Sequence, residues 1–114
     1  MALFKRKTND YETASRGLNE SQTAADKLII EQMKDDDEFA AKLVDNLKSG
    51  SPLILNFDGL GDFAANKMLA FFAGATYACE GKTVKINETT YLFARRVEFL
   101  DGSLQRFIQT LPKK

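Results

Sequence analysis

Apolar and polar residues alternate along this chain with periods that change from one segment to the next, and these periods predict strands alternating with helices. Lys27–Glu31 (KLIIE) and Leu53–Phe57 (LILNF) are short apolar runs, which predict two strands. Between them, apolar residues return every three or four positions, which predicts a helix from about Asp36 to Lys48. A strand, a helix and a strand in this order favour a right-handed crossover, so we expect the two strands to be parallel.

The ends of this first helix carry signals of their own. The acidic run Asp35–Glu38 offers an N-cap and first-turn charges that complement the helix dipole, an interpretation that we favour over a metal site. Gly50 is typical of a helix C-terminus, and Pro52 discourages continuation of the helix.

The segment Phe63–Cys79 (FAANKMLAFFAGATYAC) predicts a central helix that is apolar on both sides, with Asp62 as its N-cap and Gly81 at its end. One side is bulky, and the opposite side is lined by small residues at i, i+4 spacing. A surface helix would carry charges there, so we expect one side to pack on the domain's own core and the other on a second copy of the chain. The alternative is that another helix of the same chain covers the small side. The bulky side holds Ala64, Ala65, Met68, Leu69, Phe71 and Phe72, and the expected self-association residues are Ala70, Gly74, Tyr77 and Ala78.

After the central helix the pattern returns to short apolar runs. Thr83–Ile86 and Thr90–Ala94 predict an antiparallel hairpin, and Val97–Leu100 is a candidate for a last strand. Asp101–Gly102 predicts a tight turn, while Leu104–Ile108 is compatible with either a strand or a short helix. The expected fold is an α/β (α+β) sandwich of βαβαββ order. It has a mixed sheet of about five strands packed against two helices, and it is dimeric.

Composition narrows the range of functions. The chain has 114 residues, no formal net charge and no histidine, and it lacks a phosphate-binding glycine motif. Its single cysteine, Cys79, lies in an apolar run, which favours a buried thiol over a nucleophile. We therefore expect no catalytic residues, no metal and no cofactor. The alternative function is a small nucleic-acid-binding module, in which Tyr91 and Phe93 stack on bases beside Arg95 and Arg96. The neutral net charge argues against that alternative, so no nucleic acid is expected.

The first seven residues combine an apolar tip with cations. Leu3 and Phe4 precede Lys5, Arg6 and Lys7, a combination suited to weak contact with an anionic membrane surface. A frayed terminus is the simpler alternative. We expect three parts in the chain: a membrane-targeting segment at 1–7, a flexible linker at 8–24, and an α/β core with its C-terminal tail at 25–110.

Several runs resemble the SepF family of bacterial cell-division proteins. The sequence AGATYACEGKTVKI (Ala73–Ile86) is similar to the family's SGAVYALGGxIxRI run, and LKSGSPLILNF (Leu47–Phe57) is similar to its LKxGxPVVVNL. Residues Ala64–Met68 occupy the place of its AKRI helix start, and MALF is similar to its short MGLF-type opening. One departure is that Arg95–Arg96–Val97 stands where the family usually has a proline-containing TPxxV.

The resemblance implies a non-enzymatic adaptor that tethers the tubulin-like protein FtsZ to the inner face of the membrane at the division site. It would be cytoplasmic and peripheral to the membrane, and it would dimerise and polymerise. The family's functional glycine corresponds to Gly74. The FtsZ C-terminal tail is held near the hairpin, which by resemblance assigns Lys85 and Tyr91 to tail binding. Phe93, the second aromatic residue on the same face of that strand, is expected to contribute as well.

Overall fold

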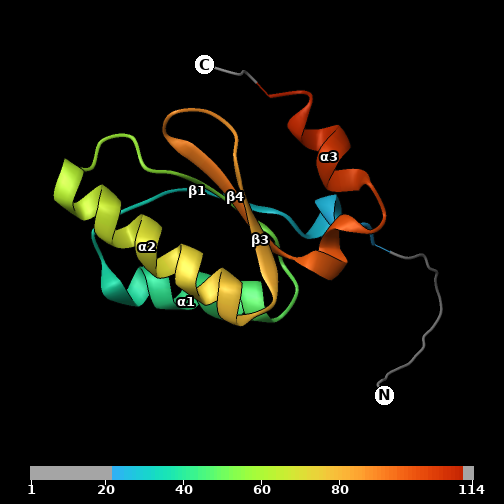
Figure 1. The fold of residues 1–114 in the computed structure, drawn as a ribbon, viewed down its shortest axis with the longest axis horizontal. Coiled ribbons are helices and arrows are strands. Elements are labelled where there is room, and N and C mark those ends of the chain that lie inside the picture. Colours follow the sequence, from blue (N-terminus) through green and yellow to red (C-terminus); the bar gives the residue numbers. More distant parts are fainter. Residues whose placement is uncertain (1–21, 112–114) are drawn as a thin grey trace.

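The computed structural model describes residues 22–111, which form a four-stranded mixed sheet with helices on both faces (Figure 1). This arrangement confirms the predicted α/β class. In chain order the elements are η1 (Ala25–Lys27), β1 (Ile29–Gln32), α1 (Asp37–Lys48), β2 (Leu53–Asn56), α2 (Asp62–Ala78), β3 (Gly81–Lys85), β4 (Thr90–Arg95), η2 (Arg96–Phe99) and α3 (Ser103–Ile108), where η denotes a 3-10 helix.

The strands lie in the order β1-β2-β4-β3. β1 and β2 are parallel, as the intervening helix predicts, and β4 is antiparallel to both β2 and β3. The prediction of about five strands is wrong for the described residues, because Val97–Leu100 does not form a strand. Most of that segment is the 3-10 helix η2, and Leu104–Ile108, left open between strand and helix, belongs to α3.

One face of the sheet, which we call the inner face, is covered by α1 and α2 (Figure 1). Leu53 and Leu55 of β2 meet the helices, and Phe72 and Phe93 are fully buried with ring centroids 5.6 Å apart. Burying side chains of this size contributes about 1.5–3 kcal/mol each, so this layer is the main source of stability. The buried members of this cluster are Met33, Ala40, Leu43, Leu47, Leu53, Leu55, Phe57, Met68, Phe72 and Phe93.

The opposite, outer face of the sheet is covered by α3, η1 and η2. Leu104 of α3 is fully buried against it, and Phe99 of η2 packs on the same cluster. The prediction of two packing helices therefore missed α3, which closes the second face. The buried members are Ala24, Ile54, Ile86, Leu92, Ala94 and Leu104.

The ends of α1 agree with its flanking signals. Asp36 is the N-cap, and its Oδ1 accepts a hydrogen bond of 3.1 Å from the backbone N–H of Phe39. At the other end Gly50 takes a left-handed φ of 106°. The backbone N–H of Gly50 donates to Leu47, and that of Ser51 donates to Asn46, a pairing that satisfies the last carbonyls of the helix.

The ends of α2 differ from the prediction. Gly61 rather than Asp62 is the N-cap, and Asp62 is the first helical residue, where its charge complements the helix dipole without a capping hydrogen bond. Gly81 does not end the helix but begins β3, and Glu80 makes the reversal with a φ of 56°. Gly81 is required for another reason: a Cβ there would lie 2.5 Å from the backbone oxygen of Ala94.

The two sides of α2 have different surroundings. Met68, Phe72 and Thr76 are buried, whereas Phe71, which the sequence placed on the buried side, is 45% exposed. Adjacent helical residues point about 100° apart, so Phe72 takes the core position and Phe71 turns outward. Ala70 and Gly74 on the small side are also exposed. Within the described residues, the alternative that another helix of the same chain covers this side is therefore wrong.

Candidate functional site

The hairpin brings Lys85 and Tyr91 directly opposite each other on neighbouring strands. Directly opposed side chains share one face of a sheet, so both lie on the inner face, the face that α1 and α2 cover. Lys85 is exposed, and its Nζ lies 3.6 Å from Oε1 of Glu88 in the turn. The cation is therefore accessible, and its pairing is a weak surface contact.

The ring of Tyr91 is held by two other aromatic rings. It makes an edge-to-face contact with Phe57 at a centroid distance of 5.9 Å and stacks on Phe93 at 6.3 Å. These contacts fix the ring, while Tyr91 itself remains half-buried. It therefore presents a preorganised apolar surface beside the hairpin. An apolar side chain of a peptide can bind to such a surface without the cost of first ordering the ring.

A pocket of about 320 Å³, which we call the hairpin pocket, opens beside this ring, between the hairpin turn and the start of α2. Part of its wall is apolar and comes from Tyr91, Phe57 and Leu69. The carboxylates of Asp58, Asp62 and Glu88 also line it. Lys85 does not line the pocket, but its ion-pair partner Glu88 does. The full lining consists of Phe57, Asp58, Gly59, Leu60, Asp62, Ala65, Asn66, Leu69, Glu88, Thr89 and Tyr91.

Phe93 does not belong to this surface. Its exposed fraction is 0%, because the ring packs between Phe57 and Phe72 in the inner core. The assignment of Phe93 to partner binding is therefore wrong. Phe93 is a core residue, and its ring supports that of Tyr91 by stacking on it. The same burial removes Phe93 from the base-stacking surface that the nucleic-acid alternative needs, and Arg95 beside it pairs with Glu98.

The outward side of α2 forms a second candidate surface. Phe63 and Tyr77 are each 84% exposed, and Ala70 and Gly74 lie between them. A Cβ added at Gly74 would meet nothing within 4 Å. Spacings of three and four residues place these side chains along one line of the helix. We call this line the α2 stripe. It consists of Phe63, Lys67, Ala70, Gly74 and Tyr77, and Phe71 and Ala78 lie beside it.

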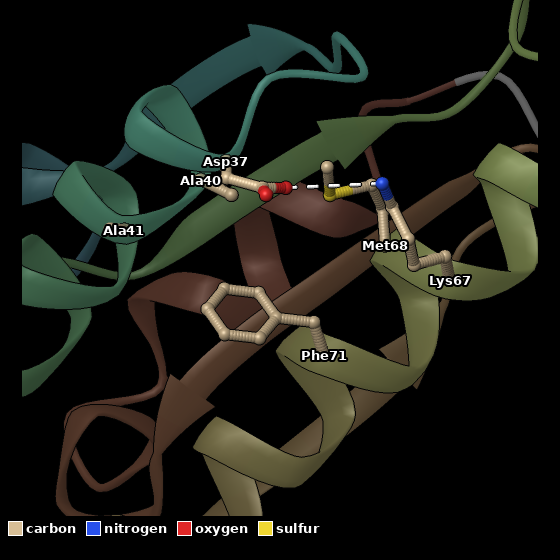
Figure 2. A pocket seen from close by; sticks show the side chains of 6 residues that line it. All are labelled: Asp37, Ala40, Ala41, Lys67, Met68 and Phe71. Carbon is tan, nitrogen blue, oxygen red and sulfur yellow. Dashed lines mark ion pairs between the residues drawn. The ribbon is translucent and has the colours of Figure 1, made fainter.

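A groove of about 370 Å³ runs between α1 and α2 next to the α2 stripe (Figure 2). Figure 2 shows Lys67 on one wall and Asp37 on the other, with Met68 and Phe71 between the helices. Nζ of Lys67 lies 2.7 Å from Oδ1 of Asp35 and 3.8 Å from Oδ1 of Asp37. The hydrogen bond to Asp35 raises the pKa of Lys67. No local sequence pattern predicts this groove, because it depends on how the two helices pack.

Other predicted features lie outside these surfaces. Cys79 is a free thiol of intermediate exposure at the end of α2. In the described residues, no group of three or more His, Cys, Asp and Glu side chains is arranged to hold a metal ion. The proposed membrane residues Leu3, Phe4, Lys5, Arg6 and Lys7 lie outside residues 22–111, as does most of the expected linker. Across the same range, no helix has the length and hydropathy needed to cross a bilayer.

Comparison with known proteins gives a consistent result. Residues 29–98 match the family model described as Cell division protein SepF. Proteins of that name are similar over the core. The chain is 32% identical over 81 residues to one from Carboxydothermus hydrogenoformans, which covers 71% of this chain and 58% of that protein. It is 30% identical over 88 residues to one from Alkaliphilus metalliredigens, which covers 77% and 59%. One from Clostridium novyi is 34% identical over 70 residues, covering 61% and 44%. The chain thus spans about half the length of the curated relatives it matches.

Proposed function

The chain belongs to the SepF family of cell-division proteins, and from this we propose that it is a non-enzymatic adaptor that binds the C-terminal tail of FtsZ. In this proposal it self-associates and helps to tether or align FtsZ filaments at the inner membrane during septum formation. Its place is the cytoplasmic side of that membrane, where it is a peripheral protein.

The observation that carries the tail-binding proposal is the hairpin pocket. Tyr91 is held by Phe57 on one side and by Phe93 beneath, so binding does not require the ring to be ordered first. An apolar side chain of the tail enters between Tyr91 and Leu69, which line the same pocket. Lys85 stands across the strand from Tyr91, where its charge can meet a carboxylate of the peptide.

The support for self-association is the α2 stripe. Phe63 and Tyr77 expose large apolar surface, and Ala70 and Gly74 between them allow another backbone to approach closely. Exposed apolar residues at spacings of three and four are typical of helices that pair. The adjoining groove between α1 and α2 continues this surface, so that Phe71 of a second copy has a place to pack.

Membrane contact in this proposal begins with residues 1–7. Burial of Leu3 and Phe4 gives at most about 1.5–3 kcal/mol each, and each cation adds about 1 kcal/mol at an anionic surface. Ordering costs reduce this sum to a weak anchor for a single chain. Self-association raises the effective concentration of anchors, so membrane binding depends on the α2 stripe.

The test is the binding of a fluorescent peptide with the FtsZ C-terminal tail sequence of the same organism to the full chain, measured by anisotropy. We expect saturable micromolar binding that is weakened about tenfold or more by Lys85→Glu. Lys42→Glu, at an exposed site on α1, is the matched charge reversal and should leave binding unchanged. Absence of binding by the wild-type chain would contradict the proposal. Equal effects of the two reversals would remove Lys85 from the site.

A further inference from the structure

A surface that combines exposed apolar and cationic residues lies where β4 ends. Val97 is 58% exposed and Leu100 is 82% exposed, although both are large apolar residues. Arg96, beside them, is exposed, as is Lys82 on the adjacent strand. We call these four residues the η2 corner. Three residues make one turn of a 3-10 helix, so Val97 and Leu100 point to the same side.

The acidic residue of this turn points inward instead. Glu98 is only 6% exposed, and its Oε2 accepts hydrogen bonds from Nε of Arg95 at 3.1 Å and from Nη2 at 2.5 Å. Its Oε1 accepts a third hydrogen bond from Nζ of Lys27 at 3.3 Å. Phe99 packs into the outer core with Nζ of Lys82 5.5 Å above its ring. The turn therefore buries its carboxylate and presents apolar and cationic groups to the outside.

The N-terminal part of the chain joins the domain at the same place. Oδ2 of Asp101, next to Leu100, accepts a hydrogen bond of 2.9 Å from the backbone N–H of Ala24. Oγ of Ser103 accepts one of the same length from the N–H of Ala25. Residues 8–23 separate the expected membrane segment from Ala24, and a chain of that length spans at most about 55 Å when fully extended.

We propose that the η2 corner is a second membrane-contact surface, which places Val97 and Leu100 among the acyl chains of an anionic bilayer. Arg96 and Lys82 lie at headgroup level, where an amphipathic surface places its cations. Glu80 and Asp101 carry opposing charge beside the corner, and Asp101 is engaged by the N–H groups of Ala24 and Ser103. The inference rests on the proposed membrane role, because residues 1–7 bring the corner within reach of the bilayer.

A site-specific label tests this contact directly in the full chain. Cys79→Ser removes the native thiol, and Leu100→Cys then carries an environment-sensitive fluorophore. We expect a blue shift of its emission on addition of phosphatidylcholine vesicles that contain about one third phosphatidylglycerol, and none with phosphatidylcholine alone. Ile30→Cys in the same background is the matched control, since Ile30 is an exposed apolar residue on β1 and should show no shift.

Vesicle sedimentation of unlabelled chains separates this inference from the membrane role itself. The double variant Val97→Ser/Leu100→Ser should bind the anionic vesicles about tenfold more weakly than wild type, and Ile30→Ser should bind equally well. Wild-type binding with no loss in the double variant and no shift at position 100 would overturn the corner alone. If wild type does not bind, both proposals fail. A lower mass in light scattering at unchanged vesicle affinity would assign the corner to a second copy instead, and would also overturn the inference.

Discussion

Asp101 and Ala24 are 77 residues apart in the chain and are joined by a hydrogen bond of 2.9 Å from the backbone N–H of Ala24 to Oδ2 of Asp101. The other carboxylate oxygen accepts from the backbone N–H of Ser103 at 2.9 Å and from its Oγ at 2.7 Å. The Asp101 side chain therefore accepts hydrogen bonds from the first residue of α3 and from Ala24. It joins the start of that helix to the start of the described part of the chain.

This arrangement predicts a specific dependence of stability on pH. The hydrogen bonds from Ser103 and Ala24 lower the pKa of Asp101 to about 2 from its ordinary value of 3.8. Because the pKa is lower in the folded state, the contribution of Asp101 is complete above about pH 4. It is lost as the pH falls toward about 2.

The variant Asp101→Asn tests that dependence through urea unfolding at a series of pH values. It should be less stable than wild type at neutral pH, and the difference between the two free energies of unfolding should shrink as the pH approaches about 2. Asp45→Asn, at an exposed position on α1, is the control and should follow the wild-type curve. A difference that does not change with pH would show that Asp101 acts through packing rather than charge.

Gly74→Lys should reduce self-association without unfolding the domain. Nothing lies within 4 Å of the position that its Cβ would occupy, so the single chain accommodates the new side chain. A facing helix would not. Light scattering should report a fall in mass toward the 12.8 kDa of one chain. Asn46→Lys on the exposed side of α1 should keep the wild-type mass; an equal fall in both variants would contradict the assignment of the α2 stripe.

Two glycines should respond in opposite ways to alanine. Gly81→Ala places a Cβ 2.5 Å from the oxygen of Ala94 and 2.9 Å from that of Thr76, so backbone must move and the loss should be about 1–3 kcal/mol. Gly74→Ala meets no neighbour and replaces a helical glycine, which should stabilise the isolated chain by about 1 kcal/mol. Denaturant unfolding at low protein concentration measures both, and equal shifts would contradict the argument.

The buried carboxylate of Glu98 should matter more than an exposed one. Glu98→Gln leaves Arg95 and Lys27 without their ionic partner, and these two cations are about one third exposed, so water offsets part of the cost. We expect a loss of about 2 kcal/mol in the free energy of unfolding. Glu88→Gln, which breaks only the exposed pair with Lys85, should change stability by less than about 0.5 kcal/mol. Similar losses in both variants would show that burial of Glu98 is not the cause.

Local patterns predicted the elements whose signals lie within a few residues. The parallel pair of β1 and β2, the limits of α1 and the hairpin all follow from periodicity and flanking residues, and the structure confirms them. The position of Lys85 opposite Tyr91 also follows once the hairpin is known. Both residues are accessible at the hairpin, but their role in binding a tail stays a prediction.

The predictions that were wrong share a cause. In each case, contacts with distant parts of the chain determine the conformation or the burial of the residue. Val97–Leu100 has the alternation of a strand, but Glu98 turns inward to meet Lys27, 71 residues away, and the segment coils into η2. Likewise, nothing local tells Phe71 from Phe72, and only the position of α1 and the sheet decides which ring is buried. Alternation cannot tell Phe93 from Tyr91 either, because both point to the same face of β4, whereas in the fold Phe93 is completely buried against Phe57 and Phe72.

β4 has a different surface at each of its ends. The hairpin pocket adjoins its first residues and the η2 corner follows its last, and Figure 1 shows the hairpin turn and the segment after β4 at opposite ends of this strand. Six residues of strand at about 3.3 Å each separate the two by about 20 Å. A hydrogen-bonded central strand does not stretch, so β4 acts as a spacer of fixed length. A peptide held at the pocket would therefore stand off from whatever the corner touches by a distance that neither binding event can alter.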